Sequence, residues 1–214
     1  MMVFTYQYML LTLAIGCLLG YSITRARKSF FQNRGEALVR RELQANFSAP
    51  DFHLLNHITL KIAGSTTQID HILVSRFGVF VIETKDYSGW IFANAKNSTW
   101  TQVLYRGKFK FQNPIFQNQR HLQAVQELLD FLPANSIKSV VVFVGKAEFK
   151  TEIPAGVCSL SSLIEYIRNH SEEVLSLNRV QFSVGRLETA RLAVSGQTDL
   201  EHLQNLEHRH GLRK

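Results

Sequence analysis

The pattern of hydrophobic and polar positions divides the chain into an apolar N-terminal run and a longer part with alternating patterns. Residues 4–23 are mostly apolar, and the first charged residue is Arg25. About 20 apolar helical residues, at a rise of ~1.5 Å each, span the ~30 Å hydrocarbon core of a bilayer. The pattern therefore predicts a transmembrane anchor over residues 1–24 and a basic juxtamembrane segment over residues 25–32.

Basic residues flank the apolar run on its C-terminal side, since Arg25, Arg27 and Lys28 all precede the first acid, Glu36. Basic flanks mark the cytoplasmic side of a membrane. We therefore expect a single-pass protein of the bacterial inner membrane with a cytoplasmic C-terminal domain. Anionic lipid headgroups are the expected partners of Arg25, Arg27 and Lys28. A cleaved signal peptide or a lipoprotein signal at Cys17 would start with a basic segment, which is missing here; a buried core helix is the third alternative.

Helical and strand patterns alternate beyond residue 33. Asn113 followed by Pro114 marks a helix start, as N-cap and first helical residue. The continuous apolar run at residues 139–144 is typical of a buried strand and is compatible with parallel pairing. The order of elements indicates one α/β domain with a mixed sheet flanked by helices. The predicted strands cover residues 53–62, 68–75, 79–85, 90–92, 100–105, 108–112 and 139–144, and the predicted helices cover residues 33–46, 114–132, 159–170 and 183–193.

Length and composition support a folded domain. The chain has 214 residues, of which 45% are hydrophobic and 19% charged, and this excludes a disordered or collagen-like protein. Two cysteines cannot build a disulfide scaffold or a four-thiolate zinc site. We expect the core at residues 33–145 and a helical extension that packs on it at residues 146–214, ending in an exposed tail. Most of the net charge of +7 comes from residues 25–41, so the overall charge is weak support for nucleic-acid binding.

Three charged residues interrupt strands that otherwise have the pattern of buried strands. Asp70 precedes the apolar run of residues 72–74, and Glu83 and Lys85 follow that of residues 79–82. A buried charge is costly unless it is paired or bound to a metal. Because side chains alternate along a strand, Glu83 and Lys85 share one face of the sheet.

The turn at residues 76–78 decides whether Asp70 joins that face. If the loop consists of Arg76 and Phe77, Asp70 lies opposite Glu83. If it consists of Phe77 and Gly78, Asp70 lies opposite Lys85. Both bring the three charged side chains together. A loop of all three residues places Asp70 opposite Thr84 instead, unless a bend or bulge near Asp70 restores the arrangement.

Two carboxylates and a lysine on one sheet face suit metal-assisted hydrolysis of a phosphodiester. Carboxylate oxygens bind Mg²⁺ and leave positions for water and phosphate, and the metal polarises the phosphorus centre. The lysine can orient or help deprotonate the attacking water and neutralise developing charge. These three residues alone are equally compatible with a buried ion-pair network that has no catalytic role.

An ordered set of residues surrounds these three. It consists of Gly35-Glu36, Gln68-Ile69-Asp70-His71, Gly78-Val79-Phe80, Ile82-Glu83-Thr84-Lys85, Gly89, Trp100, Asn113-Pro114, Gln117-Asn118 and His121. In this set the chain resembles the NERD (nuclease-related domain) family, which is related to the PD-(D/E)xK restriction-endonuclease-like superfamily. The resemblance covers roughly residues 33–131. Ile69 stands where the superfamily has a proline, a substitution that the NERD pattern shares.

The resemblance implies a restriction-endonuclease-like α/β core and a nuclease acting on DNA. It implies that Asp70 and Glu83 bind a catalytic Mg²⁺, with Mn²⁺ as the alternative ion, and that Lys85 is the catalytic lysine. It also implies that Glu36, on the first helix, completes the site and that Gln117 is an accessory polar residue.

Several of these residues have a structural alternative. Glu36 also fits a capping box with Asn33. Gln117 and His121 lie one turn apart on one helical face, where they would either bond the sheet or approach substrate. His71 follows Asp70 and points to the opposite face of the strand, so we expect it to be structural. The aromatic side chains of Trp90, Trp100 and Tyr105 would either stack on bases or, as we expect, pack in the core.

Two further functions compete with the nuclease. In one, the fold is retained and the acidic cluster is structural, and the protein tethers nucleic acid or a protein partner at the membrane. In the other, the protein is a juxtamembrane lipid-binding protein that does not depend on Glu83 or Lys85. The sequence identifies no protein partner.

Overall fold

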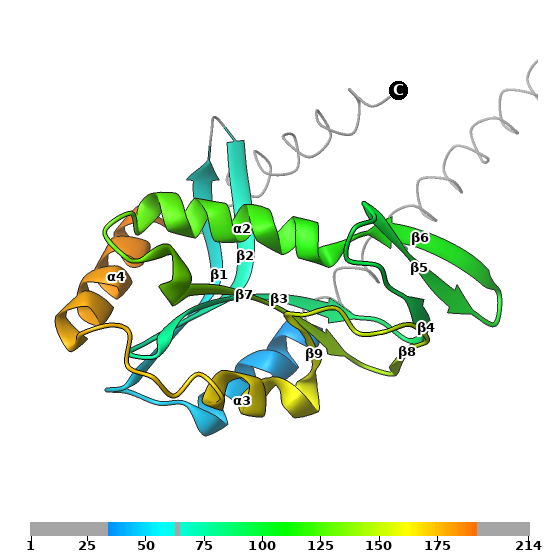
Figure 1. Cartoon of the computed structure of the whole chain (residues 1–214), viewed down its shortest axis with the longest axis horizontal. Helices are drawn as coiled ribbons and strands as arrows, with labels where there is room; N and C mark the ends of the chain where they lie inside the picture. The colour runs from blue at the N-terminus through cyan, green and yellow to red at the C-terminus, as the bar shows by residue number, and fades with distance from the viewer. Residues whose placement is uncertain (1–33, 63–64, 192–214) are drawn as a thin grey trace, which may run out of the picture.

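Two β-sheets and the helices around them make up the part of the chain described by the structure, a computed structural model that covers residues 34–62 and 65–191 (Figure 1). A helix over residues 34–46 comes first. The elements that follow are β1 (Phe52–Ile62), β2 (Ser65–Ser75), β3 (Gly78–Asp86), β4 (Gly89–Phe92), β5 (Thr99–Leu104), β6 (Gly107–Gln112), α2 (Pro114–Leu128), a 3₁₀ turn (Ala134–Ser136), β7 (Ile137–Val144), β8 (Ala147–Phe149), β9 (Val157–Ser159), α3 (Leu160–Arg168) and α4 (Leu177–Ala190).

The larger sheet is mixed and is covered by helices on both faces. Its strand order is β1-β2-β3-β7-β9, with antiparallel pairing from β1 to β3 and parallel pairing of β3 with β7 and of β7 with β9. Residues of α2 and α4 pack in one core cluster, and the helix at residues 34–46 packs with α3 in another. In Figure 1, α2 and α4 accordingly lie on one side of this sheet and α3 on the other. The mixed α/β sheet predicted from the sequence is confirmed.

The structure corrects the prediction of a single sheet, because β4, β5, β6 and β8 form a second one in the order β6-β5-β4-β8. The chain turns away from β3 at Gly89, which has φ +79°, and a Cβ there would lie 2.5 Å from the carbonyl oxygen of Val103. One face of the second sheet buries Ile91 and Trp100 against Phe143 of β7. A separate aromatic core therefore joins the two sheets.

Two helix boundaries differ from the prediction. The helix α2 starts at Pro114 with Asn113 as its cap, as predicted, but it ends at Leu128 rather than at residue 132. Pro133 disfavours the helical conformation in the residue before it, and the chain forms a turn ahead of it. The helix α4 starts earlier than expected, at Leu177, because the Ser176 side chain caps it by accepting from the backbone N–H of Arg179.

The region after residue 146, which we expected to be helical, also contributes strands to both sheets. The strand β8 pairs with β4 and β9 pairs with β7. Each has three residues, too few to leave a periodic pattern in the sequence.

Within the described residues, no helix is both long enough and apolar enough to cross a membrane. The anchor predicted at residues 1–24, the basic segment at residues 25–32 and the C-terminal tail all lie outside the described residues.

Candidate active site

The hairpin of β2 and β3 sets the position of the acidic residues. His71 pairs with Ile82 and Ser75 with Gly78, so the loop consists of Arg76 and Phe77. This is the predicted register that places Asp70 across from Glu83. Gly78 closes the loop with φ +136°, where a Cβ would lie 2.8 Å from the carbonyl oxygen of Ser136. The turn therefore fixes which face of the sheet carries the acids.

The pairing of β2 with β3 ends at Asp70. Beyond the last pair, the backbone N–H of Thr84 donates to Oδ2 of Asp70, at 2.7 Å, instead of to a strand carbonyl. Ile69 and Ile72 lie three residues apart yet pack in the same core cluster, which a regular strand does not allow. In the neighbouring strand β1, His57 has a positive φ of 52°. Both strands are thus irregular at this point, and the irregularity lies at the candidate site.

A chain of hydrogen bonds connects β3 to α2 and β2. Lys85 Nζ donates to Glu83 Oε1 at 2.5 Å and to Gln117 Oε1 at 2.9 Å. The other oxygen of Glu83 lies 3.0 Å from His121 Nε2, and His121 Nδ1 lies 2.7 Å from Thr67 Oγ1. With its proton on Nε2, His121 donates to Glu83 and accepts from the Thr67 hydroxyl. Both oxygens of Glu83 are therefore engaged by protein groups.

Glu36 approaches the same region from the first helix. Its side chain is buried, and Oε2 lies 3.2 Å from Nδ1 of His57. Its charge also acts on Asp70, as described below. The residue that would form a capping box with Glu36, Asn33, lies outside the described residues. Of the five site residues predicted from the sequence, Glu83, Lys85 and Gln117 are in direct contact, whereas Asp70 and Glu36 are related to them through the effects of their charges.

The site holds more negative than positive charge, and its pKa values reflect this. Burial raises the pKa of Asp70 well above its usual value, and the charges of Glu83 and Glu36 raise it further. Burial would also raise the pKa of Glu83, but Lys85 and His121 outweigh it and lower the pKa. Burial opposes the charge on Lys85, yet the Glu83 carboxylate and Asp70 raise its pKa. Lys85 is therefore an ammonium at neutral pH, and Asp70 holds its proton more tightly than an exposed aspartate does.

The donor set suits a hard divalent cation, although the side chains are not arranged around one. Among residues 34–62 and 65–191, no group of three or more His, Cys, Asp and Glu side chains is placed to hold a metal ion. The charges nevertheless favour a cation, because Glu36, Asp70 and Glu83 are all buried and the charges of Glu83 and Glu36 add to the effect of burial in raising the pKa of Asp70. Carboxylate oxygens are the ligands that Mg²⁺ uses in proteins. The residues fit the ion chemically, and binding it requires Glu83 to give up part of its present network.

Two asparagines hold α2 over the site. Asn118 Nδ2 donates to the carbonyl oxygens of Val81 and Val140 and lies 2.8 Å from Ser139 Oγ, so it ties the helix to β3 and β7. Asn113 is fully buried, and its side chain accepts from the backbone N–H of Ile115. Sequence reasoning placed Asn118 only in the family pattern, and it identified Asn113 as the helix cap but not its bonds to the preceding loop.

The remaining sequence predictions are resolved individually. His71 is buried, its Nδ1 lies 2.7 Å from Asn56 Oδ1, and burial lowers its pKa to about 3. It is structural, as expected. Trp100 packs in the core, also as expected, whereas Trp90 and Tyr105 are exposed and contradict that expectation. Sequence reasoning did not identify His57, because only the backbone conformation places it beside Glu36.

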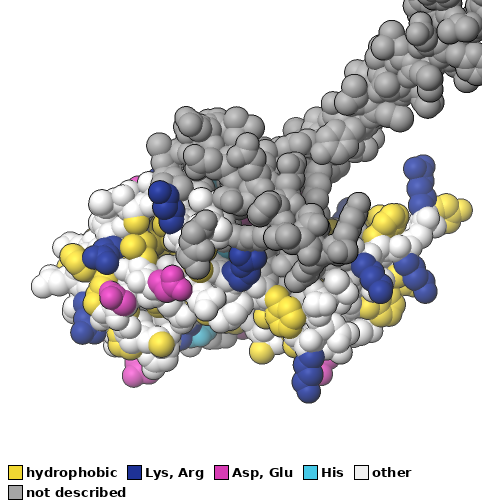
Figure 2. All heavy atoms as spheres, turned by 90° about the horizontal axis from the view of Figure 1, so that it is seen from above, with side chains coloured by type: hydrophobic (Ala, Val, Ile, Leu, Met, Phe, Trp, Pro, Cys, Tyr) yellow, Lys and Arg dark blue, Asp and Glu magenta, His cyan; other side chains and the backbone are white. Residues whose placement is uncertain are grey.

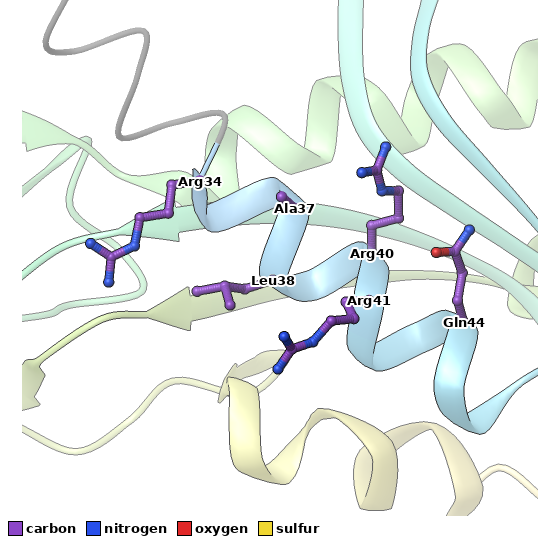
Figure 3. A pocket seen from close by; sticks show the side chains of 6 residues that line it. All are labelled: Arg34, Ala37, Leu38, Arg40, Arg41 and Gln44. Carbon is purple, nitrogen blue, oxygen red and sulfur yellow. The ribbon is translucent and has the colours of Figure 1, made fainter.

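A basic pocket lies on the first helix beside the site. Its lining includes Arg34, Arg40 and Arg41 with the apolar side chain of Leu38. Figure 3 shows Arg34 and Arg41 extending toward one side and Arg40 away from them. Burial lowers the pKa of His57, and the positive charge of Arg40 lowers it further. Arg40 thus acts electrostatically on a residue that contacts Glu36.

Comparisons with known proteins bear on this site. The sequence model of the NERD family, the nuclease-related domain, matches residues 32–144, which is more than half of the chain. An uncharacterized protein of Bacillus anthracis is 43% identical over 97 residues. That match covers 45% of each protein, so the chain spans less than half the length of this relative. No solved structure matches the chain. The match to the family model shows that this chain belongs to the NERD nuclease-related domain family, which is related to the restriction-endonuclease-like fold.

Proposed function

We propose that this protein is a metal-dependent nuclease that hydrolyses phosphodiester bonds in DNA, with Asp70, Glu83 and Lys85 at its centre and Glu36 and Gln117 beside them. The observation that carries the proposal is the position of Lys85. Its ammonium is held by Glu83 and Gln117, and the charge of Asp70 acts on it as well. An acid and a lysine fixed in this way, in a member of a nuclease-related family, favour phosphodiester chemistry over a purely structural ion pair.

Lys85 acts in this proposal as a charged donor. A raised pKa keeps the amine protonated at neutral pH, so it does not serve as the base that takes a proton from water. A lysine ammonium has three N–H donors, and Glu83 and Gln117 engage two of them. The third would donate to a phosphate oxygen and stabilise the negative charge that develops there as water attacks.

Asp70 and Glu83 would hold Mg²⁺, with Mn²⁺ as the alternative ion, and Glu36 would complete the acidic site. Bound there, the ion would polarise the phosphate and lower the pKa of a water molecule. The excess of carboxylates supports this assignment, since a divalent cation would offset both the burial and the neighbouring acidic charges that raise the pKa of Asp70. Asp70 must lose its proton before it can act as a ligand.

We place the protein in the bacterial inner membrane through the predicted helix at residues 1–24, with the nuclease-related domain on the cytoplasmic side. Arg25, Arg27 and Lys28 would contact anionic lipid headgroups. The basic flank and the absence of charge before Arg25 support this orientation.

The test is cleavage by the full chain, purified in a mild detergent. Supercoiled plasmid, linear duplex and single-stranded DNA are incubated with Mg²⁺, with Mn²⁺ and with EDTA. The variants Asp70→Asn and Lys85→Ala run beside the wild type and a matched control, Asp51→Asn, at an exposed position. Circular dichroism checks that each variant is folded. We expect metal-dependent cleavage that both site variants lose and the control keeps.

A second function is favoured by one specific observation. Both carboxylate oxygens of Glu83 already have protein partners, which is the arrangement of a closed ion-pair network. In this case the protein would be an inactive tether for nucleic acid or a protein at the membrane. A folded wild type that cuts none of the substrates with either metal would refute the nuclease and favour the tether.

A further inference from the structure

The second sheet has one face that the aromatic core does not use. Trp90 pairs with Val103, which pairs with Lys108, and these three side chains form one row across the sheet. Phe92 pairs with Thr101, which pairs with Lys110, and these form the next row. Paired residues point to the same side of a sheet, so both rows lie on one face. We call Trp90, Phe92, Lys108, Lys110 and Lys150 the aromatic–lysine face.

The two aromatic side chains on this face are exposed. Trp90 is 49% and Phe92 40% exposed, although large aromatics contribute most when they are buried. The core of this sheet is built from the opposite face, where Ile91 and Trp100 are buried. Neither Trp90 nor Phe92 belongs to a core cluster. The exposed parts of these two rings, on strands of the sheet, can therefore contact a ligand.

Positive charge surrounds these rings. Lys150 Nζ lies 4.9 Å from the centre of the Trp90 ring and 2.8 Å from the carboxylate of Glu148. Lys108 and Lys110 are exposed at the ends of the two rows. In Figure 2 the lobe formed by the β5–β6 hairpin, at the right of the view, carries basic side chains next to hydrophobic ones. Because it has three lysines and one acid, the aromatic–lysine face carries a net positive charge, which complements a polyanion.

This sheet is inserted between the two elements that carry the candidate site. The strand β4 begins at Gly89, soon after Lys85, and β6 ends at Gln112, directly before the cap of α2. The first turns of α2 carry Gln117, which accepts from Lys85. A strand bound to the sheet would therefore lie on a part of the chain that is connected to the site at both ends.

We propose that the aromatic–lysine face binds single-stranded DNA. Bases would stack on Trp90 and Phe92, which lie about 7 Å apart along β4, and the lysines would contact the phosphates. A duplex hides the faces of its bases, so stacking on side chains selects a single strand. The proposal rests on the proposed nuclease function only for the choice of DNA; binding at this face needs neither the metal nor Lys85.

Fluorescence anisotropy with a labelled thymidine oligonucleotide tests the proposal. The full chain is used in mild detergent with EDTA, so that no cleavage occurs, and the variants are Trp90→Ala, Phe92→Ala and Lys108→Ala/Lys110→Ala. Matched controls are Phe182→Ala, an exposed aromatic on α4, and Lys61→Ala, an exposed lysine on β1. Circular dichroism verifies folding, and Trp90→Phe, which keeps a stacking ring, serves as the conservative variant.

Each aromatic substitution to alanine should weaken binding of the single strand by about 5- to 140-fold. Trp90→Phe should recover most of this loss, and the controls should bind like the wild type. The double lysine variant should reduce the dependence of log affinity on log salt concentration by about 1.4. The aromatic variants should leave the weaker binding of a duplex nearly unchanged.

Three results would overturn the proposal: wild-type affinity in both aromatic variants, equal affinity for duplex and single strand, or tighter binding of a uridine RNA or of anionic lipid vesicles than of the DNA strand. The binding experiment and the cleavage experiment can fail independently of each other. A protein that binds the strand through this face but never cuts it refutes the nuclease alone. A protein that cuts DNA and binds it equally well without Trp90 and Phe92 refutes this inference alone.

Discussion

The raised pKa of Asp70 leads to a prediction about stability. An aspartate whose pKa is raised on folding is protonated in both states at low pH, where it has no effect. As pH rises above 3.8 the unfolded chain loses this proton first, while the folded protein still holds it. Folding is then penalised increasingly until pH passes the folded pKa. Asp70→Asn removes the charge, keeps the shape, and leaves an oxygen to accept from Thr84 N–H, so it should stabilise the protein at neutral and higher pH.

The expected gain follows from the size of one pKa unit. A pKa difference of one between the folded and unfolded states is worth about 1.4 kcal/mol in the free energy of unfolding once both states are ionised. For a chain of this length 1 kcal/mol moves Tm by ~2–4 °C, so a shift of a single unit corresponds to ~3–6 °C. The gain should be close to zero near pH 4 and should grow as pH rises.

Thermal unfolding followed by circular dichroism in EDTA, from pH 4 to pH 9, measures this difference. Asp51→Asn, at an exposed position, is the matched control and should leave Tm unchanged at every pH. With Mg²⁺ in place of EDTA, the wild type should gain Tm while Asp70→Asn should not. If Asp70→Asn lowers Tm at pH 8, or shifts it equally at pH 4 and pH 8, the conclusion that burial and the neighbouring acids disfavour the charge of Asp70 is refuted.

Three further predictions follow from the same contacts. Lys85→Met leaves Glu83 buried without its cation and should lower the free energy of unfolding, measured in urea, by about 3–5 kcal/mol. The double variant Lys85→Met/Glu83→Gln should recover part of this stability. If the two substitutions lower stability in a strictly additive way, the network is contradicted. Asn113→Ala removes the cap of α2 and a donor to the Asn97 carbonyl, at 2.8 Å, and should lower the free energy of unfolding by about 1–3 kcal/mol. A change below ~0.5 kcal/mol would argue against this role of Asn113. The rate of Mg²⁺-dependent cleavage should rise with pH because Asp70 must release its proton, and a rate that falls over the same range would exclude Asp70 as a ligand.

The sequence limited the register of the site to three alternatives without choosing among them. The short turn before Gly78 allowed only a small number of loop lengths, and most of them brought Asp70 to the face of Glu83 and Lys85. The strand irregularity at His57 and Asp70 could not be predicted, since it depends on backbone conformation in two neighbouring strands. This irregularity allows the Asp70 carboxylate to accept the hydrogen bond from the Thr84 N–H that holds it in place.

The second sheet was missed for a different reason. Local patterns predicted β4, β5 and β6 as separate strands, but pairing partners are not a local property. β8 supplies an edge of that sheet with only three residues, which carry no periodicity. Trp90 and Trp100 were therefore treated alike, although one lies on the exposed face and the other in the core.

The central claim is that the cluster of Asp70, Glu83 and Lys85 is a metal site and not a closed ion-pair network. Binding of Mn²⁺ to the full chain at pH 8, measured from the loss of the free ion's electron paramagnetic resonance signal, tests it most directly. We predict one ion per chain, displaced by excess Mg²⁺, with affinity at least about tenfold lower in Asp70→Asn and in Glu83→Gln and unchanged in Asp51→Asn. A folded wild type that binds no Mn²⁺, or binds it as well without these carboxylates, would contradict the claim.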